Sequence, residues 1–301
     1  MRLPIVHHAD YDAKTVADDH RFPMRKYALV AELLRAAGHG FILPEAAPED
    51  WLTLAHDEAY VTAILTQTLD AKAARKVGFE ITPAIARRSA ASVGGTCLAA
   101  RLALEQGAAV NLAGGSHHAG PDGGAGFCVF NDVGVAGKLL LETKEVRRVA
   151  VIDCDVHHGD GTAVIFRHDP RVFTASLHCE QNWPREKPPS DLDMGLPKGT
   201  GDAEYLSALE HLVEAALGTS PDIVFYNAGV DPHAEDRLGL LSLTDDGLRA
   251  RDGFVAKACR SAGIPLCGVL GGGYARDARA VARRHTFLVE AVGAAFQSVA
   301  D

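Results

Sequence analysis

The stretch VIDCDVHHGDGT, residues 151–162, passes from an apolar run directly into three aspartates and two adjacent histidines, with no lysine or arginine between them. Its apolar half is typical of a strand that is buried on both faces of a parallel sheet. In an extended segment, Asp153, Asp155 and His157 alternate onto the same face. The stretch therefore predicts a buried parallel strand that ends in a group of metal-binding or catalytic side chains.

Other apolar runs have the same character and alternate with amphipathic segments. Together with the opening stretch, the expected strands cover residues 109–115, 149–155, 172–178, 222–231 and 265–274. Helices are expected from Thr82 to Gly107, from Thr244 to Gly263 and after Asp202, where capping residues precede apolar residues at helical spacing. This alternation predicts an α/β fold with a parallel sheet, helices on both faces and right-handed crossovers. No linker or repeat divides the chain, so we expect a single domain over residues 1–301.

The composition limits the class of protein. The chain has 301 residues and a net charge of -9, which argues against nonspecific nucleic-acid binding and is compatible with a basic partner such as a lysine-rich protein tail. Its six cysteines include no CxxC pair, so a reduced compartment is expected. The first residues lack the apolar core of a signal peptide, and no run approaches the ~20 apolar residues of a membrane span. We therefore expect a cytoplasmic protein with no membrane segment.

Polar residues follow four of the expected strands. His117 and His118 come after the first, the group around Asp155 after the second, Asp231 ends the fourth, and Tyr274 ends the fifth. Ligands of open parallel sheets bind outside the carboxyl ends of the strands. These side chains, distant in the chain, are therefore expected to meet in one cleft.

A metal ion is the best physical use for this group. Asp155, His157 and Asp231 would make a three-ligand site with a position open for water and substrate, as in catalytic zinc sites. An imidazole with two carboxylates suits one zinc ion, and also Fe2+, manganese or cobalt.

The remaining groups fit the hydrolysis of an amide. His117 and His118 are candidates for the base that activates water and the acid that protonates the leaving amine. Asp153 and Asp160 are placed to orient the two imidazoles. The Tyr274 phenol can donate to the carbonyl oxygen as it becomes negative.

Each motif has an ordinary structural explanation when it stands alone. A single DxH is usually a turn or a capped strand end, adjacent histidines such as His7 and His8 are usually surface or packing residues, and three consecutive glycines are usually a turn. Their coincidence at several strand ends favours a catalytic site.

Four motifs together carry a family resemblance: GGSHHAGPDGGAGFCVFND (residues 114–132), VIDCDVHHGDGT (151–162), YNAGVDPHAEDRLGLLSLT (226–244) and GVLGGGY (268–274). The chain resembles the zinc-dependent histone deacetylase family over nearly its whole length, and within it the class IV-like deacetylases of bacteria. The resemblance implies an arginase/deacetylase-like fold. It also implies zinc on the three metal candidates, with the histidine pair and the tyrosine in the catalytic roles given above.

The resemblance further implies a narrow acyl-lysine tunnel and a structural potassium ion. The residues that match substrate-contacting positions are Gly126, Phe127, Trp183, Leu238, Gly272, Gly273 and, at the rim, Glu58. The residues that match the potassium site are Asp153, Asp155, His157, Ser176 and Leu177.

The expected activity is hydrolysis of N-ε-acyl-lysine in a protein or peptide, with acetyl or longer acyl groups. An alternative is deacetylation of acetylpolyamines or another small acyl-amine. A polyamine enzyme should carry carboxylates at the mouth, for which the candidates are Asp57, Glu58, Glu180 and Glu186. A module that only binds acyl-lysine is disfavoured because no catalytic or metal position is lost.

The expected fold also resembles that of the binuclear manganese ureohydrolases. Those enzymes place further metal-binding carboxylates in two of the same motifs. Here Gly159 and His233 occupy those positions, so a full second metal shell is not expected.

Overall fold

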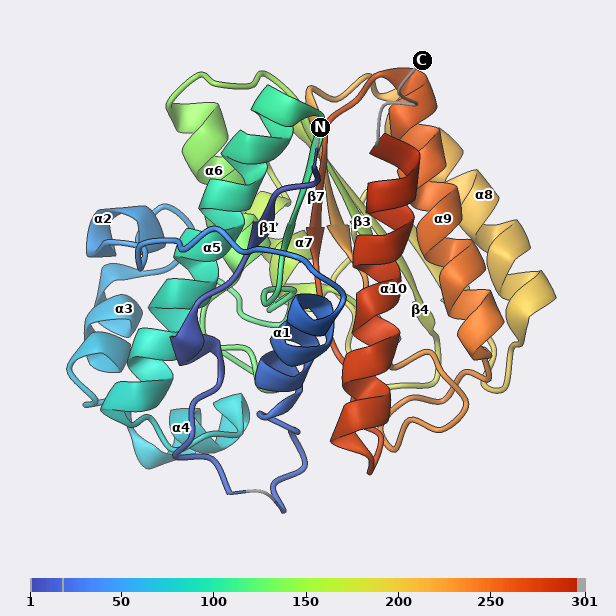
Figure 1. The fold of residues 1–301 in the computed structure, drawn as a ribbon. Coiled ribbons are helices and arrows are strands. Elements are labelled where there is room, and N and C mark those ends of the chain that lie inside the picture. Colours follow the sequence, from blue (N-terminus) through green and yellow to red (C-terminus); the bar gives the residue numbers. More distant parts are fainter. Residues whose placement is uncertain (1, 18, 297–301) are drawn as a thin grey trace.

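A parallel sheet forms the centre of the computed structural model, which describes residues 2–17 and 19–296 (Figure 1). Its strands are β1 (Ile5–Val6), β2 (Ala108–Asn111), β3 (Val149–Asp153), β4 (Val172–Cys179), β5 (Leu192–Leu196), β6 (Ile223–Asn227) and β7 (Leu266–Val269). The seven strands lie in the order β1-β2-β7-β6-β3-β4-β5, and every neighbouring pair is parallel. The predicted parallel α/β fold is confirmed.

Helices cover both faces of this sheet. They are η1 (Ala9–Tyr11), α1 (Lys26–Ala36), α2 (Glu49–Leu52), α3 (Glu58–Leu65), α4 (Ala71–Val77), α5 (Pro83–Gln106), α6 (Asp132–Glu142), α7 (Asp160–Phe166), α8 (Asp202–Gly218), α9 (Asp245–Ala262) and α10 (Ala278–Phe296). Helix α5 packs on the strands and on α6, while α8, α9, α10 and α1 form a continuous layer in which each contacts the next (Figure 1). Figure 1 shows these two layers on opposite sides of the sheet.

The ends of α5 and α9 follow from local sequence. The Thr82 hydroxyl accepts a hydrogen bond from Ile85 N at 3.3 Å, and the Thr244 hydroxyl accepts one from Gly247 N at 3.0 Å. Helix α9 stops at Gly263, whose φ of 68° is the left-handed conformation that glycine adopts without a steric penalty. Both helices were predicted with these limits because capping depends only on neighbouring residues.

Two strands were not predicted. β1 has only two residues, which is too short for a periodic signal. β5 lies at the edge of the sheet, and its residues are half-buried or exposed, with Asp193 and Gly195 inside the strand. Neither strand shows the continuous apolar character by which the other five were recognised.

The buried strands set the position of the loops that carry the polar motifs. β2, β7, β6 and β3 are neighbours in the sheet, and their core residues are almost completely buried. Because these strands are parallel, their carboxyl ends lie along one edge.

Along the described residues, no helix is both long and apolar enough to cross a membrane.

Candidate active site

Three buried side chains meet at the carboxyl edge of the sheet. His157 Nδ1 lies 3.0 Å from Asp155 Oδ1 and 3.1 Å from Asp231 Oδ2. One potential ligand atom from each residue falls within 4.8 Å of the others, and the three residues are buried. The loops after β3 and β6 thus bring together the three residues predicted as metal ligands.

Backbone amides orient the two carboxylates. Val156 N donates to Asp231 Oδ1 at 2.9 Å, and Gly272 N donates to Asp155 Oδ2 at 2.7 Å. Gly272 leaves no room for a side chain, because an added Cβ would lie 2.1 Å from Asp231 Oδ2. The loop after β7 therefore closes against the metal candidates at Gly272, whose expected contact with substrate stays a prediction.

Two buried carboxylates concentrate negative charge in this group, which favours a cation. Burial raises the pKa of Asp231, and the negative charge of Asp155 raises it further, to about 7. Burial opposes a charge on His157, but hydrogen bonds to Asp155 and Asp231 outweigh it and raise its pKa to about 10. These protons supply positive charge that a divalent ion would supply in their place. Two carboxylates and one imidazole therefore fit a zinc-type ion.

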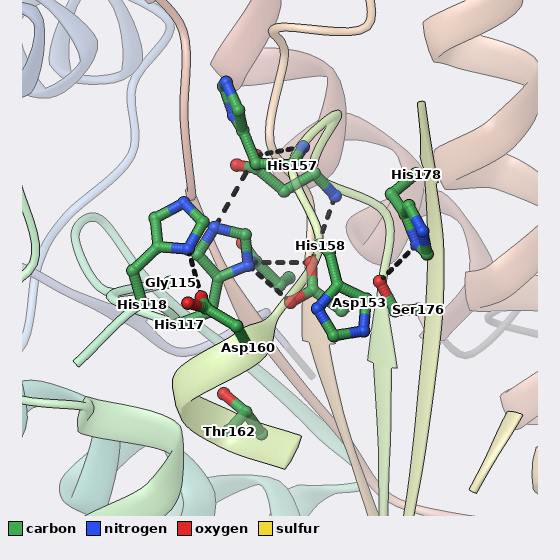
Figure 2. A network of polar contacts seen from close by, with 12 residues as sticks. Gly115, His117, His118, Asp153, His157, His158, Asp160, Thr162, Ser176 and His178 are labelled. Atoms are coloured by element: carbon green, nitrogen blue, oxygen red, sulfur yellow. Dashed lines mark hydrogen bonds and ion pairs between the residues drawn. The ribbon is translucent and has the colours of Figure 1, made fainter. Parts of the chain in front are cut away.

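Each of the paired histidines is held by its own carboxylate (Figure 2). His117 Nδ1 donates to Asp153 Oδ2 and His118 Nδ1 donates to Asp160 Oδ1, both at 2.6 Å. Both imidazoles are buried, and their ring centroids are 4.0 Å apart. Each carboxylate thereby orients its imidazole and leaves Nε2 available for proton transfer.

The two histidines differ in charge. Burial opposes a charge on His117, but Asp153 and Asp155 outweigh it and raise its pKa to about 9. Burial, followed by the neighbouring charge of His117, lowers the pKa of His118 to about 3. The two pKa shifts are opposite in direction, which favours one proton donor and one proton acceptor in the pair.

Asp132, which was not predicted, supports the loop that carries the histidine pair. Its carboxylate accepts from Ser116 N at 2.9 Å, from Gly115 N at 3.2 Å and from the Thr96 hydroxyl at 2.6 Å. Asp132 lies within the quoted motif of residues 114–132, but nothing in the local pattern shows that its side chain returns to the start of that motif.

Tyr274 lies beside the metal candidates with its phenol protonated. Its ring centroid is 6.1 Å from that of His157, and the residue is buried. Burial, followed by the charges of Asp155 and Asp231, raises its pKa well above the ordinary value. A neutral phenol in this position can donate a hydrogen bond to a substrate oxygen.

One pocket of about 620 Å³ opens above these groups. His118, His157 and Tyr274 line it, together with Gly126, Phe127, Trp183 and Leu238, four of the residues that the resemblance assigns to substrate contact. Its volume falls in the range of small-molecule sites.

Two residues shape the wall on one side of this pocket. Gly126 and Phe127 have φ values of 55° and 68°, and a Cβ at Gly126 would lie 2.7 Å from both His118 and Trp183. Phe127 is thus a non-glycine residue in a strained left-handed conformation, a feature that concentrates at functional sites.

The pocket is not lined by Glu58, Gly273, Ser176 or Leu177, four of the residues assigned to substrate contact or to the potassium site. Glu58 is exposed at the start of α3 and does not line the pocket. Gly273 does not line it either, and its added Cβ would meet Val230 at 2.6 Å, so its role is backbone packing. Ser176 pairs in register with Asp153, and Leu177 follows it within buried β4.

A second metal does not fit beside the first. His233 Nδ1 accepts from Glu235 N at 3.0 Å, and its Nε2 lies 3.3 Å from Asp245 Oδ1, so both nitrogens have partners elsewhere. Another group that could hold a metal, His158, His178 and Asp193, lies where β4 and β5 meet, but none of its residues lines the pocket. Within residues 2–17 and 19–296, the geometry therefore supports one metal position at the pocket.

Arg251 of α9 fixes the backbone of both ligand loops from behind. It is fully buried, and its guanidinium donates to Cys154 O at 3.3 Å and Gly229 O at 2.5 Å. It also donates to Asp252 Oδ1 at 2.9 Å. Sequence reasoning missed this residue because nothing in the local pattern shows that its side chain turns back to loops 22 and 97 positions earlier in the chain.

Comparison with known proteins agrees with this geometry. Residues 20–291 match the family model of the histone deacetylase domain. An uncharacterized protein of Picosynechococcus sp. is 45% identical over 96% of this chain and 97% of its own length. Histone deacetylase 2 of Arabidopsis thaliana is 30% identical over 93% of this chain and 76% of its own length. A probable deacetylase of Archaeoglobus fulgidus is 30% identical over 91% of this chain and 82% of its own length.

A solved structure is similar in fold. The HDA15 HD domain superposes with a TM-score of 0.82 at 22% sequence identity, covering 100% of this chain and 91% of that one.

Proposed function

Since this chain belongs to the histone deacetylase family and is therefore a deacetylase, we propose that it is a metal-dependent hydrolase of N-ε-acyl-lysine. The observation that carries the proposal is the buried group of Asp155, His157 and Asp231, of which His157 lines a pocket together with His118 and Tyr274. An elongated acyl-lysine side chain fits a pocket whose reactive groups lie at the bottom and whose walls are aromatic.

The residues divide the work of amide hydrolysis. Asp155, His157 and Asp231 would hold one zinc ion, or Fe2+ in its place, which when bound polarises the carbonyl and makes water more acidic. His117 and His118 would move protons at Nε2, because Asp153 and Asp160 occupy their Nδ1 atoms. The Tyr274 hydroxyl would donate to the carbonyl oxygen as negative charge develops there.

The walls select the acyl-lysine chain. Phe127 and Trp183 place aromatic surface on the pocket, which suits the apolar methylenes of lysine and excludes water from the amide.

Two implications of the family resemblance stay predictions. One is the likeness to class IV-like enzymes, and the other is a structural potassium ion at Asp153, Asp155, His157, Ser176 and Leu177.

The test is turnover of the zinc-loaded protein on a single lysine peptide whose acyl group ranges from acetyl to myristoyl. We expect kcat/KM to be measurable for at least one chain length and to disappear when the metal is removed by a chelator. Asp231→Ala should lose both bound metal, measured by elemental analysis, and activity. A protein that carries stoichiometric metal and yet cleaves no member of the series would overturn the proposal.

A further inference from the structure

The mouth of the active-site pocket carries positive charge without a compensating carboxylate. Its lining includes four cationic side chains, Arg21, Arg75, Lys76 and Arg237, and no aspartate or glutamate. The chain as a whole has the opposite balance, with 39 acidic and 30 basic residues. The mouth is therefore a local exception to the charge of the protein.

Structural contacts hold two of these cations at the mouth. The backbone amides of Gly126 and Phe127 donate to Lys76 O at 3.2 Å and Val77 O at 2.7 Å. These bonds fasten the last turn of α4, which contains Arg75 and Lys76, to the pocket wall. The two charges thus belong to the built pocket and not to a detached surface helix.

Arg237 is oriented by the opposite side of the pocket. Its Nε donates to Tyr274 O at 2.7 Å and its Nη2 donates to Arg21 O at 3.3 Å. Among the described residues, Nη1 has no hydrogen-bond partner. A guanidinium that is already oriented and keeps free N–H groups is well suited to bind a carboxylate.

The cations of this rim are not engaged by nearby acids in the described part of the chain. Over the part of the chain that the structure describes, Arg21, Arg75, Lys76 and Arg237 form no ion pair. Asp236 is next to Arg237, but its carboxylate accepts from the amides of Leu238, Gly239 and Tyr274.

The acidic residues that a polyamine substrate would need also lie elsewhere. Asp57, Glu58, Glu180 and Glu186 do not line the pocket. Asp57 instead lines a neighbouring surface hollow, which shares Lys76 with the pocket. A second ammonium group at this mouth would meet like charges.

We propose that this site selects acyl-amides whose amine side carries a carboxylate close to the acylated nitrogen. The inference rests on the proposed function, because it assigns the inner end of the pocket to the acyl group and the exposed cations to the leaving amine. The carboxylate can come from an aspartate or glutamate beside an acyl-lysine in a peptide, or from the α-carboxylate of free N-ε-acyl-lysine.

The test compares substrates that share one scissile amide. Three acetyl-lysine peptides of equal length are flanked by aspartate, glutamine or lysine. They are assayed beside free N-ε-acetyl-lysine, its α-amide and N-acetylputrescine. An exposed ion pair changes binding only modestly, so kcat/KM should rise about 1.4- to 5-fold, for each ion pair that the aspartate flanks form, from the lysine-flanked to the aspartate-flanked peptide. The ratio should fall towards one in 1 M salt, where the screening length is ~3 Å.

A charge-neutralising variant links the preference to the rim. R75Q/K76Q should reduce the aspartate-to-lysine ratio of kcat/KM, and it should leave the fold intact because both residues are exposed. K72Q is the matched control on the same helix, because Lys72 lies away from this pocket. Its ratio should equal that of the wild type.

The outcomes separate this inference from the proposed function. Turnover of the glutamine-flanked peptide without any flank preference, or a preference for N-acetylputrescine, would overturn the inference and leave the hydrolase assignment standing. Absence of turnover on every substrate by the metal-loaded protein would overturn the proposed function itself. A preference seen only in peptides assigns the carboxylate to a protein substrate, and one seen only for free acetyl-lysine over its α-amide assigns it to a small molecule.

Discussion

Replacement of Arg251 by methionine should destabilise the protein and weaken its metal site. The guanidinium is completely buried, and it donates to Asp252 and to the carbonyls of Cys154, Ala228 and Gly229. Cys154 precedes metal candidate Asp155, and Gly229 lies two residues before Asp231. Loss of the guanidinium therefore removes the donors that hold both loops.

The expected loss of stability follows from the groups that Arg251→Met leaves unpaired. Asp252 keeps its bond from the Tyr226 hydroxyl at 2.6 Å but loses its buried counter-charge, and the carbonyls lose their donors. Breaking a buried ion pair by removing one partner costs about 3–5 kcal/mol. At about 2–4 °C per kcal/mol for a chain of 150–250 residues, Tm should fall by about 6–20 °C, and somewhat less in this longer chain.

The assay is thermal unfolding followed by circular dichroism, together with metal content after dialysis. Arg249→Met is the matched control, because Arg249 lies on the same helix and its ion pair with Glu290 is exposed. Its Tm should change little, since exposed pairs contribute about 0–1 kcal/mol. Arg251→Lys, which keeps a charge but has fewer donors, should fall between the two. An Arg251→Met protein with the wild-type Tm and metal content would refute the proposed support of both loops by Arg251.

Three other changes test the site. Tyr274→Phe should keep metal content and lower kcat about 100- to 1000-fold, as loss of one oxyanion donor does; an unchanged kcat measured under saturating substrate would refute the role of the phenol. Gly272→Ala should lower metal affinity, because its Cβ would lie 2.1 Å from Asp231 Oδ2; a metal titration that matches the wild type would contradict this packing. Lys26→Met removes the donor to Gly271 O at 2.9 Å, so unfolding in urea should show a loss of about 1–3 kcal/mol. No loss would mean that water replaces the lysine.

Much of the fold could be predicted because its signals are local. The Thr82 and Thr244 caps involve bonds to residues three positions away, and both were recognised. The buried strands were recognised from continuous apolar runs. β5 was missed because it has no continuous apolar run. As an edge strand it is partly exposed, so its residues do not need to be apolar.

The reactive groups could be predicted because a parallel sheet places its carboxyl ends along one edge. Asp155, His157 and Asp231 were therefore expected to meet, and the structure brings them within 4.8 Å of one another. Their proposed chemistry depends only on the residue types and on that convergence.

The charge of the mouth and the support behind the site were decided by tertiary structure alone. Arg75 lies at the mouth because the wall of the pocket binds the end of α4, and Arg237 because the carbonyl of Tyr274 orients it. Arg251 reaches Cys154 across 97 positions of the chain. The sequence by itself determined the strands, the helix caps and the chemical groups at the strand ends, since these depend on short-range spacing and on sheet topology. It did not determine the neighbours of long cationic side chains, because those are set by the packing of segments that are far apart in the chain.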